Sequence, residues 1–251
     1  MKTMLVLSMG ALLLAGTLSA QTPIPEWQAG VDKMKILIQT NPAQASEEVG
    51  GLLKGKNKKN VDLVTSVAHV YLDAGKLTEA QEYLAMAKKA DNKDPKVSVL
   101  EGDIALAQKD IGQACQLYEQ AIYFDPNCKE AYLKYAQAYK SASPALAIEK
   151  LEQLKAVDPN CLEADRELAE VYYSSNRFGK AAEMYAKFID TPLAAEDDML
   201  KYAFALFLNH DFEKSLQVAQ KGLQKNARHA AFNRLVMYNN TDLKRYEDAE
   251  K

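Results

Sequence analysis

The sequence repeats a pattern of about 34 residues from residue 61 to its end. In each copy one helical stretch ends, a short polar turn follows and a second helical stretch begins, as in residues 71–80 and 172–181. Aligning the turns gives units of residues 61–94, 95–128, 129–161, 162–195 and 196–229, and a partial unit of residues 230–251. A helical unit that recurs at this period predicts a stack of similar helix pairs, each of which buries its apolar side against its neighbours.

Small side chains return at two places in every unit. The eighth position holds Ala68, Gly102, Ala136, Ala169 and Ala203. A position in the second helix holds Ala80, Ala114, Ala147, Ala181, Ser215 and Ala249. Where two helices cross closely, only small side chains fit between them. We therefore expect these residues to be buried inside antiparallel helix pairs.

The units resemble tetratricopeptide repeats, which pair two antiparallel helices in 34 residues. Small residues at the eighth and twentieth positions, Tyr71 and Tyr172 at the eleventh, and Pro126 and Pro159 near unit ends carry the resemblance. Other units depart from it, since Asn92, Leu193 and Ala227 replace the terminal proline. The resemblance covers residues 61–251 and implies an all-α fold, a right-handed α-solenoid of antiparallel helix pairs.

Residues 21–60 are less regular than the units that follow. Residues 27–39 and 43–53 read as two amphipathic helices, and we expect this hairpin to cap the first end of the solenoid. Trp27 is expected to pack in the core or at its edge rather than to form a ligand platform. Residues 54–60 are expected to form a solvated basic loop. At the other end, the sixth unit stops soon after Ala249, which indicates either a truncated array or a partner that covers it.

The first twenty residues differ from all the others. Lys2 precedes an apolar run, and small residues lead up to Ala20, in the order of a secretory signal peptide. The apolar run is shorter than the roughly 20 residues that span a membrane. We therefore expect residues 1–20 to be cleaved, without later membrane insertion, and the protein to be exported to the periplasm or cell envelope. An uncleaved anchor is the alternative.

The sequence offers no sign of an enzyme, a cofactor or a metal site. The formal charge of −3 does not favour nucleic acid as a partner. His69, His210 and His229 lie in different units, without the spacing that metal ligation from one helix needs. Cys115, Cys128 and Cys161 are expected to be reduced and largely buried, since Cys128 and Cys161 occupy equivalent positions about 10 Å apart.

Helix starts can also be read from the sequence. Ser143 before Pro144 suits a helix N-cap, and residues 78–81 form a candidate capping box. The acidic residues 196–198 are expected to favour the start of a helix rather than to take part in catalysis.

The resemblance further implies that first helices line a concave groove, with positions two, five, nine, twelve and thirteen of each unit pointing into it. These positions are polar in the early units and become apolar later. We therefore expect a protein or peptide partner to bind at Tyr173, Leu200, Phe204, Phe207, Leu208, Arg234 and Tyr238. The alternative is that the apolar strip of unit five belongs to the core. The lysine and asparagine pattern by which some family members grip a peptide C-terminus is not reproduced.

Two functions follow as hypotheses. The first is a scaffold or adaptor of the cell envelope that holds a partner segment in the groove. The second is a structural spacer in a longer envelope protein whose active domain lies beyond residue 251.

Overall fold

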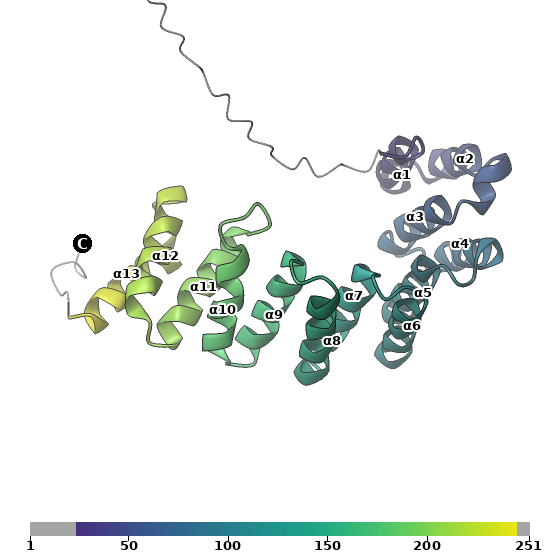
Figure 1. Cartoon of the computed structure of the whole chain (residues 1–251). Coiled ribbons are helices and arrows are strands. Elements are labelled where there is room, and N and C mark those ends of the chain that lie inside the picture. Colours follow the sequence, from purple (N-terminus) through teal and green to yellow (C-terminus); the bar gives the residue numbers. More distant parts are fainter. Residues whose placement is uncertain (1–23, 245–251) are drawn as a thin grey trace, which may run out of the picture.

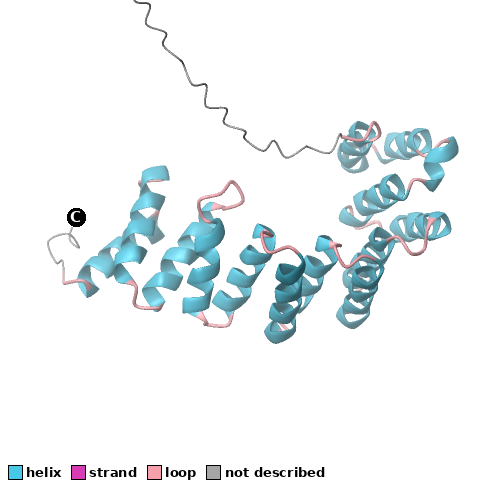
Figure 2. Cartoon of the chain, viewed as in Figure 1, coloured by secondary structure: helices cyan, strands magenta, loops and turns pink. Residues whose placement is uncertain are grey.

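The computed structural model describes residues 24–244, and all regular structure in that range is helical (Figure 2). The predicted signal peptide and Ala249 lie outside the described residues. None of the helices described is long and apolar enough to cross a membrane. The helices are α1 (Gln28–Thr40), α2 (Pro42–Leu52), α3 (Val61–Asp73), α4 (Leu77–Ala90), α5 (Pro95–Ala107), α6 (Ile111–Phe124), α7 (Lys129–Tyr139), α8 (Pro144–Val157), α9 (Leu162–Ser174), α10 (Phe178–Phe188), α11 (Glu196–Leu208), α12 (Phe212–Lys225) and α13 (Ala230–Asp242).

Consecutive helices pack as pairs that follow one another along a bent path from α1 to α13 (Figure 1). The first helices of successive pairs start 33 or 34 residues apart, at Val61, Pro95, Lys129, Leu162, Glu196 and Ala230. This arrangement confirms the predicted all-α solenoid. The hairpin of α1 and α2 shares its core with α3, since Val31 and Met34 belong to the same apolar cluster as Val64. That residues 21–60 cap an array of residues 61–251 stays a proposal.

The small residues at the helix crossings are buried, as the sequence predicts. Relative exposure is at most 1 % at Ala68, Ala136, Ala169, Ala203 and at every described alanine of the second-helix series. Gly102 shows how close the helices come, because a Cβ atom there would lie 2.5 Å from the ring of Tyr118. The crossings therefore leave no room for larger side chains.

Helix starts agree with the sequence in part. Glu196, Asp197 and Asp198 occupy the first turn of α11, and the Asp198 carboxylate accepts a hydrogen bond of 2.7 Å from the Ala195 N–H. Ser143 is the N-cap of α8, but its side chain makes no capping hydrogen bond. The capping box predicted at residues 78–81 is wrong. The helix α4 already begins at Leu77, so the Thr78 hydroxyl lies inside the first turn instead of before it.

The basic segment between α2 and α3 is not a simple loop. Gly55–Lys59 forms a 3₁₀-helix, which starts at a positive φ of 57° that glycine tolerates. The Asn57 amide donates a hydrogen bond of 3.0 Å to the Leu52 carbonyl and ties this turn to the end of α2. The sequence shows the lysines but not this tie, because it depends on where α2 ends.

Candidate binding site on the inner face

The first helices form one continuous side of the solenoid. The helix α5 contacts α3 and α7, α7 contacts α9, and α11 contacts α13, whereas no two described second helices pack comparably. In a bent stack the more closely spaced helices lie on the shorter, inner side. We call the surface of α3, α5, α7, α9, α11 and α13 the inner face. Between α9 and α11 the packing is looser, and ion pairs from Arg166 to Asp198 (3.1 Å) and from Lys201 to Glu170 (2.9 Å) cross this gap.

The first half of the inner face, formed by α3, α5 and α7, is held together by polar contacts between repeats. At its centre, Asp103 on α5 lies 2.9 Å from both His69 Nε2 on α3 and Lys134 Nζ on α7. Its other carboxylate oxygen accepts a hydrogen bond of 2.7 Å from the Tyr118 hydroxyl on α6. One carboxylate therefore joins four helices from three consecutive units.

The environment of Asp103 favours its charged form. Burial alone would raise the pKa of this carboxyl group, but the hydrogen bond with His69 and the positive charge of Lys134 outweigh that effect and hold the pKa below its ordinary value. Because the side chain is only 10 % exposed, water screens these interactions little. The network therefore stabilises the relative placement of units one to three.

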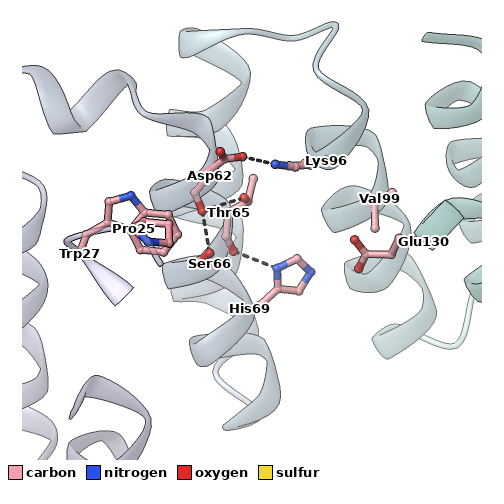
Figure 3. Close-up of a pocket in the computed structure, with 9 residues that line it drawn as sticks. All are labelled: Pro25, Trp27, Asp62, Thr65, Ser66, His69, Lys96, Val99 and Glu130. Carbon is pink, nitrogen blue, oxygen red and sulfur yellow. Dashed lines mark hydrogen bonds and ion pairs between the residues drawn. The ribbon is translucent and has the colours of Figure 1, made fainter. Parts of the chain in front are cut away.

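A pocket of about 330 Å³ opens at the start of the inner face (Figure 3). Apolar side chains and charged ones share its lining, which comprises Pro25, Trp27, Asp62, Thr65, Ser66, His69, Lys96, Val99 and Glu130. Asp62 and Lys96 form an ion pair across it. Trp27 packs against the core, as predicted, and in addition forms part of the pocket wall. The sequence gives no sign of this pocket, because Trp27 reaches it from outside the repeats.

The second half of the inner face, formed by α9, α11 and α13, carries an apolar strip on α11 and α13, and most of the predicted binding residues lie in that strip. Leu200, Phe204 and Phe207 are half-buried and pack against the cluster that contains Phe232. Leu208 is 44 % exposed. The strip of unit five is therefore partly core and partly surface, so neither alternative from the sequence describes it fully.

The remaining predicted residues are divided between this strip and its surroundings. Tyr238 on α13 is 42 % exposed, and its ring centroid lies 6.1 Å from that of Phe207. Arg234 is exposed on the same helix. Tyr173 instead packs edge-on against Phe178, with ring centroids 5.7 Å apart. The structure thus joins Tyr238 to the strip and gives Tyr173 an aromatic partner outside the predicted set.

The cysteines are reduced, as the sequence predicts. Cys115 and Cys161 are buried and Cys128 is partly buried. Burial raises the pKa of the Cys115 thiol to about 11, which makes it a poor nucleophile. In residues 24–244 no three His, Cys, Asp or Glu side chains gather in a way that could hold a metal ion.

Comparison with known families agrees with this architecture. Residues 67–127 and 137–195 match the model of the tetratricopeptide repeat. The matched residues are similar to tetratricopeptide repeats. Such repeats generally mediate protein–protein interactions, and their fold is typically a non-catalytic scaffold. No curated protein sequence matches the chain.

Solved structures show the same fold at low sequence identity. PilW, described as a widely conserved type IV pilus biogenesis factor, is 17 % identical, with a TM-score of 0.63 over 82 % of this chain and 95 % of PilW. A tetratricopeptide repeat protein from Parabacteroides merdae is 13 % identical, with a TM-score of 0.55 over 89 % of each chain. YrrB, a tetratricopeptide repeat protein with an unusual peptide-binding site, is 15 % identical, with a TM-score of 0.53 over 70 % of this chain and 92 % of YrrB.

Proposed function

We propose that the protein is a scaffold or adaptor that binds a segment of a partner protein on the second half of its inner face. The observation that carries this proposal is the apolar strip on α11 and α13, where Leu208 and Tyr238 are each more than 40 % exposed beside half-buried Phe204 and Phe207. Exposed aromatic and aliphatic side chains of this kind mark contact surfaces, because burying them on binding removes apolar area from water.

The place of action proposed is the cell envelope. Residues 1–20 carry the order of charge, apolar run and small residues that a signal peptide has. PilW, the pilus biogenesis factor, shares the fold. Secretion of a reporter fused to residues 1–25, compared with a fusion in which apolar residues 11–14 become charged, tests export. Equal reporter activity outside the cytoplasm for both fusions would contradict it.

The binding proposal is tested with a photo-crosslinking amino acid placed at Leu208. Its control is the same amino acid at Leu146, which is 39 % exposed but lies on the second helix α8, away from the inner face. In cells that make the protein, we expect irradiation to join a defined partner to the Leu208 variant and not to the Leu146 variant. Equal crosslinking at both positions, or none at Leu208, would contradict binding at the strip and favour a structural spacer.

The structure also decides which substitutions are informative. Serine at Phe204 or Phe207 would disturb the core, since both rings pack against buried residues of α11 and α13. Leu208 and Tyr238 are better probes, because their exposed side chains contribute less to folding. Circular dichroism of each variant distinguishes a loss of binding from a loss of fold.

A further inference from the structure

Polar side chains on the inner face form contacts that repeat from one unit to the next. At the three junctions from unit two to unit five, the ninth residue of a unit contacts the sixth residue of the following unit. Two of these contacts have the same chemistry: Asp103 binds Lys134 at 2.9 Å, and Glu170 binds Lys201 at 2.9 Å. Each acid also accepts a hydrogen bond from a tyrosine of its own unit, from Tyr118 at 2.7 Å and from Tyr185 at 2.8 Å. In both places the carboxylate is neutralised and well bonded.

The contact between units three and four lies between these two contacts along the solenoid and is formed by different residue types. Here the ninth residue is Gln137, and the sixth residue of the next unit is Glu167 where the other two have lysine. Leu151 occupies the position of the tyrosine, so no hydroxyl group is present to donate. Glu167 therefore faces a neutral amide, and it forms no ion pair with any residue in the described range.

The Glu167 carboxylate is also poorly bonded. One oxygen accepts a hydrogen bond of 2.7 Å from the Gln137 amide. The other is enclosed by protein and accepts none from the described residues. A carboxylate can accept about four hydrogen bonds, and a partly buried charge without a counter-ion is unfavourable. The residue itself remains partly exposed, so an incoming group can approach its carboxylate from the inner face, but it can bond the enclosed oxygen only after the side chain turns.

We propose that Glu167 and Gln137 form a subsite for a basic side chain, lysine or arginine, of an extended partner segment. This rests on the proposed function and names the chemistry of its partner. Among the carboxylates of these three contacts, only that of Glu167 has no cation beside it. The positive charge of a lysine or arginine side chain complements it. The Gln137 amide, which donates to Glu167, presents its own oxygen as a second acceptor for an ammonium or guanidinium group.

The position of the subsite also sets a spacing in the partner. Glu167 lies on α9, and the exposed Leu208 and half-buried Phe204 lie on α11, the next helix of the inner face. Packed helices lie about 10 Å apart, and α9 and α11 pack more loosely than that, so at least three residues of extended chain, at about 3.3 Å each, are needed to span them. A segment with a basic residue three or more positions from a large apolar residue therefore fits both places at once.

The test is selection of a phage-displayed library of random twelve-residue peptides on the purified protein. We expect recovered peptides to be enriched in lysine or arginine three or more positions from an aromatic or aliphatic residue. The most enriched peptide is then synthesised with a fluorescent label, together with a version in which the basic residue is glutamine. Their affinities are measured for wild type, Glu167→Gln and Glu167→Lys by fluorescence anisotropy.

Glu167→Gln should weaken binding of the basic peptide about tenfold, as expected for one charge-assisted hydrogen bond, and Glu167→Lys should weaken it more. Neither should alter binding of the glutamine version. The matched control is Glu149→Gln on α8, because Glu149 is also a carboxylate bonded only to a glutamine amide, from Gln153 at 3.4 Å, and lies away from the inner face. It should leave affinity unchanged.

Different negative results would contradict the proposed function and the proposed subsite. If the library yields no peptide that binds wild type, the proposed function itself fails, and the subsite with it. If peptides bind but lack basic residues, or bind Glu167→Gln as well as wild type, only the subsite is overturned. Circular dichroism should show the same helix content for all variants, and the melting temperature of Glu167→Gln should equal or exceed that of wild type, because a poorly compensated charge is removed.

Discussion

The two halves of the inner face join consecutive units with different kinds of side chain. In the first half, charged side chains bridge consecutive units, and Asp103 alone contacts three of them. In the second half, ion pairs still join α9 to α11, but between α11 and α13 half-buried rings such as Phe204 and Phe207 fill the equivalent space beside Phe232. Paired charges need fixed geometry to offset their loss of hydration, whereas apolar contacts are not directional.

That difference suggests a division of labour along one solenoid. The charged side chains of the first half bind one another and so hold the units in place. Few of them remain free to bind a ligand. The apolar half leaves Leu208 and Tyr238 exposed, and contacts without fixed direction can adapt to a ligand. The following experiments attempt to break this distinction, starting with the largest expected effect.

Asp103→Ala should lower the free energy of unfolding by about 3 kcal/mol, because it leaves Lys134 without its counter-charge, and His69 and Tyr118 without their hydrogen-bond partner. Urea denaturation followed by circular dichroism measures this. The control is Asp62→Ala, which removes another ion pair between units but a half-exposed one, and should cost about 0.5 kcal/mol. Equal losses for the two variants would show that Asp103 has no special role in joining the units.

Alanine at two buried glycines compares the rigidity of the halves directly. At Gly102 a Cβ atom would lie 2.5 Å from the Tyr118 ring, and at Gly222 it would lie 2.6 Å from the Phe232 ring. The Tyr118 hydroxyl is bonded to Asp103, which restrains the ring, whereas the Phe232 ring has no hydroxyl group and is held by apolar packing alone. Gly102→Ala should therefore cost about 2 kcal/mol and Gly222→Ala clearly less, by the same denaturation experiment. The reverse order would refute a more rigid first half.

Most of the fold could be predicted from the sequence, because it depends on a period. Ala68 and Ala80 mark a close crossing whatever surrounds them, and their equivalents return in each unit. The apolar strip could be predicted for the same reason, since position within the unit determines which face a residue occupies. The repeat period alone does not determine how deeply each side chain of the strip is buried. Phe204 and Leu208 both belong to the strip, yet only Leu208 is more than one-third exposed.

The polar contacts escaped prediction for a different reason. Each joins positions in different units, as Gln137 does with Glu167, and depends on the offset between helices. A list of groove positions omits the sixth residue of each unit and therefore misses Glu167 and Lys134. Comparing the sixth and ninth positions as a pair would have exposed the odd one, because lysine opposite an acid occurs twice and glutamate opposite glutamine once.

Acid should weaken the first half selectively. The pKa of Asp103 is lower in the folded protein than its ordinary value of 3.8, so its contribution to stability is present above that value and is lost as the pH falls through the folded-state pKa. The difference in unfolding free energy between wild type and Asp103→Asn should therefore be full at pH 7 and should shrink below about pH 4. Denaturation at a series of pH values measures it. A difference that stays constant down to pH 2.5 would contradict the assignment.

The smallest effect on stability is expected at the edge of the apolar half. Leu208→Ser changes a side chain that is 44 % exposed, so it should lower the free energy of unfolding by less than about 1 kcal/mol. Leu146→Ser, at 39 % exposure on α8, should cost a similar amount. The two variants should differ in binding, because only Leu208 lies on the inner face, and peptides selected on wild type should lose affinity for Leu208→Ser alone. If Leu208→Ser instead unfolds the protein or binds normally, the exposed edge is structural, and the two halves differ in composition but not in role.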